Sequence, residues 1–318
     1  MRHTLDFEKT ISDLQDKISK LKDSGSDKTS LVEVNEQIEE IKVKIDKKLN
    51  DIYKKLTPWH KLQVARHPER PHFKDYIKTL FQDFEALSGD RLFKEDPALL
   101  CGFATFYDKS VMIMGHEKGR DTEGRIQHNF GMAKPEGYRK AQRLMKIAEK
   151  FNLPVITFVD TPGAFPGKDA EERGQSESIA STIAISLKVK IPIISLIIGE
   201  GGSGGAIALA TADRILMLEH AIYSVISPEG CASILWRNTE YTQQAAETLK
   251  LTARDCYSLK IIDEIISELP GGAHRFPLEQ ASVIKKTLVS SLESLRIIDT
   301  EVLIKNRNEK YLNITSNI

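Results

Sequence analysis

Apolar side chains in the first part of the chain recur at steps of three and four residues, the spacing of one helix face. They form two series, Phe7, Ile11, Leu14, Ile18 and Leu21, then Val34, Ile38, Ile41, Ile45, Leu49, Ile52 and Leu56. Between the series lies Ser24-Gly25-Ser26-Asp27, a run of turn-forming residues. The pattern predicts a helical hairpin over residues 1–56. Two helices bury little apolar surface alone, so we expect the stripe to pack on the rest of the chain or on another chain.

After about Thr57 the pattern changes to short, β-branched apolar runs, each followed by a helix-like segment. The runs cover residues 111–114, 154–159, 192–198, 214–218 and 223–225. The helix-like segments cover 135 to about 151, about 172 to 187, 206–212, and a segment after the loop 227–230 that extends through 236. Apolar strands that alternate with helices predict a parallel sheet in an α/β domain, here residues 57–318. In such folds ligands bind at the carboxyl ends of the strands, where the glycine-rich loops of this chain lie.

Composition narrows the class of protein. The 318 residues are 41% hydrophobic and 28% charged, which suits a globular chain and excludes a disordered or fibrous one. The 45 basic and 45 acidic side chains balance, so no net field favours nucleic acid or an anionic membrane as a partner. No apolar run approaches the roughly 18 residues that cross a bilayer, and the first residues contain no apolar leader. We therefore expect a cytoplasmic protein.

The three cysteines, Cys101, Cys231 and Cys256, lie far apart and form no Cys-x-x-Cys pair. Such spacing predicts neither a disulfide framework nor a metal site. We expect buried thiols and no metal on this chain.

The richest segment is residues 199–205, Gly-Glu-Gly-Gly-Ser-Gly-Gly, which satisfies several motif patterns at once. Its Gly-x-Gly-x-x-Gly spacing after a predicted strand, with Glu219 20 residues after Gly199, is typical of a dinucleotide site. The Gly-x-Ser-x-Gly spacing around Ser203 is that of a hydrolase nucleophile elbow, with His220 and His274 as candidate bases. The segment also partly matches the phosphate-binding loop pattern, but Gly205 occupies the position of the lysine in that pattern.

These patterns share one physical feature, a strand that leads to the N-terminus of a helix. The first N–H groups of a helix have no partner within it and carry the positive end of its dipole, so an anion or a developing oxyanion fits there. Consecutive glycines let a flat or bulky group reach those amides. A second loop, residues 161–167, is stiffened by two prolines and should line the same crevice. The predicted substrate-binding residues of the two loops are Gly163, Ala164, Phe165, Gly201, Gly202 and Ser203.

Longer stretches of the chain carry a family resemblance. They are residues 156–167 (ITFVDTPGAFPG), 171–177 (EERGQSE), 198–206 (IGEGGSGGA) and 223–236 (YSVISPEGCASILW), with shorter matches at 66–68, 115–120, 129–132, 135–140 and 271–275. Together with the helical N-terminal extension, they resemble the carboxyltransferase alpha subunits of bacterial acetyl-CoA carboxylase over nearly the whole chain. The motif positions show no departure from the family.

The resemblance implies a crotonase-like α/β fold, a spiral of β-β-α units with an N-terminal helical hairpin and C-terminal helices. It implies carboxyl transfer from carboxybiotin on a biotin carboxyl carrier protein to acetyl-CoA, giving malonyl-CoA in the first committed step of fatty acid synthesis. The active site is shared with a beta subunit that bears a zinc ribbon, and neither chain is active alone. The implied assembly is α2β2, joined by biotin carboxylase in an ATP-dependent, nucleotide-binding complex.

In this family the backbone amides of a glycine pair, here Gly204 and Gly205, contact the ureido carbonyl of biotin. Two amides aimed at that oxygen stabilise the negative charge it acquires when the carboxyl group leaves, and each donor is worth about 3 kcal/mol in a dry site. The ureido anion then takes a proton from the acetyl-CoA methyl group, so no side-chain base is required. Structural roles are therefore expected for the nearby acids and histidines, Glu117, Glu200, His116, His220 and His274.

A local excess of positive charge lies between residues 118 and 146. Its cations are Lys118, Arg120, Arg125, Lys134, Arg139, Lys140, Arg143 and Lys146, against Asp121, Glu123 and Glu136. The phosphates of coenzyme A or an acidic carrier domain fit such an excess, with Lys118 and Arg120 as the predicted substrate-binding members. A solvated helix face is the alternative reading.

Three other functions fit parts of the pattern. A crotonase-type acyl-CoA hydratase or isomerase would use two glutamates, with Glu117 and Glu200 as candidates, and would work without biotin. An NAD-dependent oxidoreductase would use the glycine spacing, although the helix predicted after it is only seven residues long. A noncatalytic scaffold would act through the N-terminal hairpin.

Overall fold

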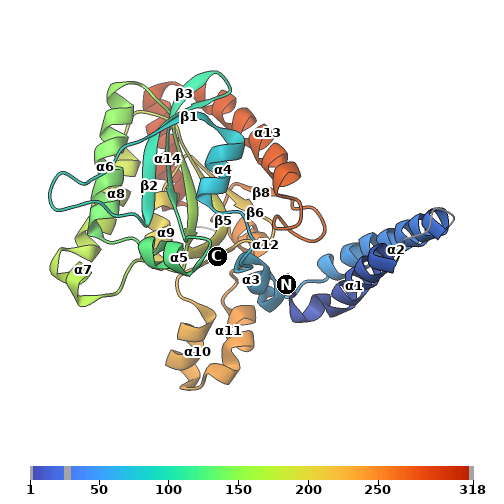
Figure 1. The fold of residues 1–318 in the computed structure, drawn as a ribbon. Helices are drawn as coiled ribbons and strands as arrows, with labels where there is room; N and C mark the ends of the chain where they lie inside the picture. Colours follow the sequence, from blue (N-terminus) through green and yellow to red (C-terminus); the bar gives the residue numbers. More distant parts are fainter. Residues whose placement is uncertain (1–2, 25–29, 315–318) are drawn as a thin grey trace.

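The structure, a computed structural model, describes residues 3–24 and 30–314. Within these residues eight strands form one sheet, around which the helices of the main body pack (Figure 1). The strands are β1 (Gln82–Ala86), β2 (Leu99–Phe106), β3 (Lys109–His116), β4 (Val155–Thr161), β5 (Ile193–Gly202), β6 (Arg214–Leu218), β7 (Ile222–Ser224) and β8 (Glu264–Ile266).

The sequence pattern predicts a parallel sheet, but the observed sheet is mixed. Its order is β1-β2-β3-β4-β5-β6-β8, with β7 paired to β5. The pairs among β1, β2 and β3 are antiparallel, whereas all pairs from β3 to β8 are parallel. Tyr107 and Asp108, with φ of +49° and +57°, form the two-residue turn between β2 and β3. Such a short turn joins only antiparallel neighbours, which explains the difference.

Helices follow the parallel strands as expected, with differences in their bounds, including α10, which begins at Pro228 inside the expected loop 227–230. They are α6 (Pro135–Lys150), α7 (Lys168–Glu172), α8 (Gln175–Lys188), α9 (Ser203–Ala210) and α10 (Pro228–Trp236). The single helix expected from about 172 to 187 is interrupted because Gly174 has a left-handed φ of +81°. Helix α9 begins at Ser203 rather than at residue 206, so Gly204 and Gly205 lie inside its first turn.

The remaining elements cover the sheet, extend from it or connect its strands. They are η1 (Asp6–Glu8), α1 (Lys9–Ser24), α2 (Ser30–Tyr53), α3 (Pro58–Ala65), α4 (Phe73–Leu80), α5 (Thr122–Gln127), η2 (Asn129–Gly131), η3 (Thr239–Tyr241), α11 (Thr242–Thr248), α12 (Ala253–Ser258), α13 (Pro277–Arg296) and α14 (Thr300–Leu312). Helices α10 and α11 project together from the end of the body at which α9 lies (Figure 1).

The N-terminal helices α1 and α2 lie side by side and extend away from the main body (Figure 1). Their apolar stripe packs mainly between the two helices, and its base reaches Val64 of α3. Tyr53 Oη donates a 2.8 Å hydrogen bond to Glu8, and Arg275 pairs with the same carboxylate at 3.0 Å. The stripe is thus partly covered within this chain, where Ile11, Ile38, Ile45 and Leu49 are buried and its other members are half-buried. Of the expected turn, residues 25–27 lie outside the described residues.

Strands β4 and β5 are buried along their whole lengths, so close packing on both faces fixes the loops that follow them.

Cys101, Cys231 and Cys256 are buried free thiols, as their spacing in the sequence predicts, and burial raises the pKa of Cys101 to about 12. Across residues 3–24 and 30–314, no helix is both long enough and apolar enough to cross a membrane.

Candidate active site

The two glycine-containing loops predicted from the sequence meet at the ends of β4 and β5. These strands are parallel neighbours, and Thr161 pairs with Gly201. A Cβ built on Gly202 lies 2.1 Å from the carbonyl oxygen of Pro162, and one built on Gly205 lies 2.6 Å from the backbone nitrogen of Ala164. The backbones therefore touch, and only glycine fits at these two positions.

The glycine pair supplies backbone amides at the start of α9. A helix leaves its first N–H groups without partners inside it, and no hydrogen bond from Gly204 or Gly205 N–H to a group outside the helix occurs among the described residues. Gly204 is half-buried, and a Cβ there meets only Ile179, at 3.5 Å. Open space therefore lies beside the Gly204 Cα, at the start of α9.

The preceding residue, Ser203, is exposed and has a φ of +50°, so the chain turns sharply between strand and helix. This is the backbone shape of a nucleophile elbow, but no hydrogen bond in the described chain joins Ser203 to His220 or His274. The His220 ring packs on Tyr53, and the His274 ring stacks on His67 at 3.8 Å. The geometry gives Ser203 no base, which disfavours the hydrolase reading.

The opposite wall is the rigid loop after β4. Thr161 Oγ1 donates to Gly163 O at 2.7 Å and accepts from Gly163 N at 3.1 Å. Gln175 donates to Phe165 O at 2.9 Å, and the Lys134 ammonium lies 4.6 Å from the centre of the Phe165 ring. Gly163 and Ala164 lie beside α9, next to Ser203 and Gly205, while Phe165 packs toward Lys134 and Gln175.

A chain of ion pairs lies beneath the glycine loop. Lys118 Nζ lies 2.7 Å from Asp160 Oδ1 and 2.9 Å from Glu200 Oε1. Arg66 Nε donates to Glu200 Oε2 at 2.6 Å, and Arg66 Nη1 donates to Glu229 of α10 at 2.6 Å. Asp160 also accepts from the backbone N–H of Glu200 at 2.9 Å. The network thereby connects the glycine loop to β4, α3 and α10.

Glu200 and Lys118 are held in their charged forms. Burial disfavours the charge of Glu200, but Lys118 and Arg66 outweigh burial and hold the pKa of the Glu200 carboxyl at about 2. Burial also opposes the charge of Lys118, and Asp160 and Glu200 raise the pKa of its ammonium above the usual value. Glu200 is thus a fixed anion and not a proton donor at neutral pH.

The two glutamates of the hydratase alternative are both occupied. Glu117 accepts backbone N–H bonds from Lys74 and Gly119, each at 2.9 Å, and Glu200 is ion-paired as described. His116 is fully buried, and burial lowers the pKa of its ring to about 4. An acid–base pair for hydration needs two carboxyl groups that can exchange protons, and Glu200 is held as an anion by its ion pairs, which disfavours this alternative.

The structure separates Lys118 from Arg120. Lys118 lines a cavity of about 240 Å³ together with Arg66 and Phe130, and its charge is already paired. Arg120 pairs with Asp75 of α4 and lines a different cavity, about 700 Å³, between the hairpin base and the main body. Substrate binding by these two cations stays a prediction.

Sequence reasoning gave no role to three residues that shape the site. Arg66 and Asp160 complete the ion-pair network, and Tyr138 of α6 places its buried hydroxyl 3.0 Å from where a Gly205 Cβ would stand. Each lies in a stretch that resembles the family, but no local pattern signals its contacts. Among the described residues no group of three or more His, Cys, Asp or Glu side chains is placed to hold a metal ion.

The paired Glu200 carboxylate makes stability depend on pH. Its folded-state pKa lies below the model-peptide 4.5, so its stabilisation is present above about pH 4.5 and is lost as the pH falls toward 2. We expect Glu200→Gln to lower the free energy of unfolding by about 3 kcal/mol at pH 7 and by clearly less at pH 3. Urea unfolding at both pH values measures this. An equal loss at the two pH values would contradict the ion-pair account.

Comparison with known proteins shows the family of the chain over nearly its whole length. The family described as "Acetyl co-enzyme A carboxylase carboxyltransferase-like" matches residues 4–315. The acetyl-coenzyme A carboxylase carboxyl transferase subunit alpha of Paramagnetospirillum magneticum is 56% identical over 312 residues, 98% of this chain and 97% of that protein. The subunit of the same name from Zymomonas mobilis is 55% identical over 310 residues, 98% of each chain.

Solved structures confirm the predicted fold class. The 12S transcarboxylase superposes with a TM-score of 0.57 at 17% identity over 71% of this chain, which spans 42% of that longer chain. A Pseudomonas malonate decarboxylase hetero-tetramer chain gives a TM-score of 0.54 at 15% identity, covering 66% of this chain and 84% of that one. The fold is the crotonase-like α/β fold. On the full-length similarity to the curated subunits, the chain belongs to the family of acetyl-CoA carboxylase carboxyltransferase alpha subunits, which are transferases.

Proposed function

We propose that the chain binds the biotin side of the carboxyl transfer reaction, in which carboxybiotin on a carrier protein gives its carboxyl group to acetyl-CoA. The observation that carries this proposal is the amide pair of Gly204 and Gly205, which starts α9 with no acceptor outside the helix and borders open space at Gly204. Gly163, Ala164, Phe165, Gly201, Gly202 and Ser203 form the walls around the ring.

The two amides have one chemical task. They donate to the ureido oxygen, whose negative charge grows as the N–C bond to the carboxyl group breaks, and each donor contributes about 3 kcal/mol in a dry site. Carboxybiotin supplies the carboxyl group and, once it has released that group, a ureido base for the methyl proton of acetyl-CoA. This division of labour agrees with Glu117 and Glu200, which are both tied up by other contacts.

The site needs a second chain. The start of α9 provides one pair of glycine amides, and a thioester carbonyl needs donors of its own. We assign these to a zinc-ribbon-bearing beta subunit in an α2β2 assembly in the cytoplasm. The use of ATP belongs to the biotin carboxylase component, and we assign no nucleotide site to this subunit.

Arg120 is the better placed of the two predicted cations for coenzyme A phosphates, because its guanidinium is more than half exposed. Residues 1–56 and 57–318 are the two structural units, and the chemistry lies in the second.

Mixing the subunits tests the proposal. The purified chain alone is expected to show no transfer of carboxyl from malonyl-CoA to a free biotin derivative, and adding the beta subunit is expected to restore it. Acetyl-CoA release measures the reaction, and the beta subunit alone is the control. Full activity of the isolated chain would contradict a shared site. Hydration of an enoyl-CoA by the isolated chain would favour the hydratase alternative instead.

A further inference from the structure

One face of α6 carries a continuous row of positive charge. Arg139, Arg143, Lys146 and Lys150 follow one another at steps of four, three and four residues, so they lie along one side of the helix. Arg91, from the loop between β1 and β2, faces the same row across a groove of about 790 Å³. We call this the basic groove, defined by Arg91, Arg139, Arg143, Lys146 and Lys150.

The cations of the basic groove are poorly compensated. Lys146 and Lys150 are exposed and make no ion pair with any described residue. Arg143 donates only to the backbone, to Gly89 O at 3.0 Å and Ser88 O at 3.2 Å. Burial and the neighbouring Arg91 charge both lower the pKa of the Arg143 guanidinium, which indicates mutual repulsion.

Cations elsewhere in the molecule show the contrast. Lys118, Arg70 and Arg307 each lie within 3 Å of a carboxylate oxygen, and each is buried in a network. In the basic groove the lining carboxylates are Asp90 and Glu177, and Glu177 lies 3.7 Å from Arg139. Five cations against two anions leave a local field that attracts a negatively charged surface.

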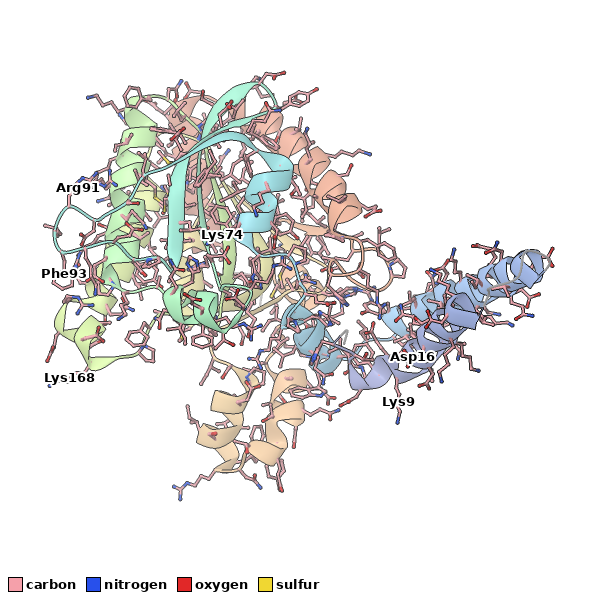
Figure 2. All side chains as sticks on the ribbon, in the orientation of Figure 1. Lys9, Asp16, Lys74, Arg91, Phe93 and Lys168 are labelled. Carbon is pink, nitrogen blue, oxygen red and sulfur yellow. The ribbon has the colours of Figure 1, made fainter. Side chains whose placement is uncertain are left out.

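The rim of the basic groove is apolar, which favours a protein over a small anion. Leu92 and Phe93, beside Arg91, are 77% and 60% exposed, and Phe151 at the far end of α6 is 62% exposed. Figure 2 shows Arg91 and Phe93 on the loop that stands out beside α6. Exposed aromatic and aliphatic side chains next to arginine are the composition of protein–protein contact surfaces, whereas a phosphate group needs only the cations.

The basic groove begins next to the active site. Tyr138, one residue before Arg139, packs against Gly205, and Arg139 donates to the carbonyl of Arg173 just before α8. From there the row runs along α6 to Lys150, eleven residues or about 16 Å away. A domain seated on the row therefore has one edge close to the glycine pair.

We propose that the basic groove docks the biotin-bearing carrier domain, through an acidic face of that domain. The inference rests on the proposed function, because only a carrier that must reach Gly204 and Gly205 requires a docking surface here. A small, charge-led contact suits a carrier that leaves in every cycle, since electrostatic complementarity raises the rate of association more than the lifetime of the complex.

The test compares two biotin substrates in the assembled alpha–beta enzyme. The variant R91E/K146E/K150E reverses the charge of three exposed side chains, of which Arg91 donates a hydrogen bond to the carbonyl of Ser88. For this variant we measure transfer to the biotinylated carrier protein and to a free biotin derivative. The KM for the carrier is expected to rise about tenfold or more, and its salt dependence to flatten. Turnover of the free derivative is expected to stay within about twofold, because the docking surface is not needed for it.

Two further variants control the comparison. K109E/K285E/K286E reverses the same number of charges at exposed positions outside the basic groove and is expected to leave both KM values unchanged. R91Q/K146Q/K150Q removes charge without reversing it and should give an intermediate KM for the carrier.

The outcomes separate the possibilities. An unchanged KM for the carrier, or an equal loss with both substrates, would overturn carrier docking at the basic groove. A selective rise in the KM for malonyl-CoA, the carboxyl donor in this assay, would assign the groove to coenzyme A phosphates and would overturn the proposal as well. If the unaltered enzyme transferred carboxyl to neither substrate, the proposed function itself would fall.

Discussion

Gly204→Val is expected to lower kcat for carboxyl transfer about 10²- to 10³-fold while the fold and the contact with the beta subunit persist. A Cβ at this position meets only Ile179 side-chain carbons, at 3.5 and 3.6 Å, so the structure has room for it. The new side chain stands in the space through which a ligand reaches the amides. The loss therefore reports on access to the amide pair and not on folding.

The neighbouring glycine cannot give so clean a result. A Cβ at Gly205 lies 2.6 Å from Ala164 N and 2.8 Å from Gly163 C, and both are backbone atoms. Gly205→Ala must push the two loops apart, so its activity loss mixes chemistry with structure. This difference makes Gly204 the position of choice for testing the amides.

A matched control for Gly204→Val is Gly230→Ala. Gly230 also lies in the first turn of a helix, and a Cβ there meets only side-chain atoms of Ile226 and Ser227, at 3.1 to 3.2 Å. Activity, thermal unfolding and binding to the beta subunit are measured for both variants. Full activity of Gly204→Val would show that this amide does not contact the reacting group, and loss of folding would show that the site is less open than the structure indicates.

The sequence located the candidate site because the rules involved are local. A glycine-rich segment after an apolar run marks a strand that ends in a loop, and the ends of parallel neighbours lie at one edge of a sheet. Residues 161–167 and 199–205 were predicted to line one crevice on that basis, and Thr161 does pair with Gly201. The helix start was misplaced by three residues, because glycines predict turns and their poor helix propensity hides a first turn.

The rest depended on contacts that no local pattern encodes. Arg66 lies 134 residues from Glu200 and 163 from Glu229, and nothing in either segment identifies the partner. The antiparallel strand β1 was missed for another reason. β1, Gln82–Ala86, is polar and largely exposed, so it lacks the apolar run that revealed the central strands.

The second large effect is expected at a buried ion pair, where Arg70→Met should cost about 3–5 kcal/mol of folding free energy at pH 7. Arg70 and Glu268 are both almost inaccessible to solvent, and two hydrogen bonds of 2.9 and 2.6 Å join them. Glu268 also accepts the backbone N–H groups of His220 and Ala273 at 2.9 and 2.8 Å. Methionine preserves most of the volume but leaves the carboxylate buried without its cation.

Two comparisons separate the ion pair from the packing around it. R70M/E268Q removes both charges of this pair and keeps an amide oxygen for one of the two backbone donors, which reach different oxygens of Glu268. It is therefore expected to be about 1 kcal/mol more stable than Arg70→Met alone. Arg254→Met removes a guanidinium that is 74% exposed and lies 3.9 Å from Glu219, and it should cost less than about 1 kcal/mol. Urea unfolding measures all three variants.

The pH dependence of that cost has a definite sign. Burial opposes the charge of Glu268, but the attraction of Arg70 is stronger and holds the pKa of the carboxyl at about 2. The stabilisation from this ion pair in the wild-type protein therefore persists until the pH falls below about 4.5. Without Arg70, burial raises the pKa of Glu268, and the variant recovers stability as the carboxylate takes up a proton. The difference in folding free energy between the wild type and Arg70→Met should therefore narrow as the pH falls from 7.5 to 5, and a constant difference would contradict an electrostatic origin.

Arg70 also contacts the strand that leads to the glycine loop, because Arg70 Nε donates to Ile198 O at 2.7 Å. The same variant should therefore lose transfer activity even where it stays folded.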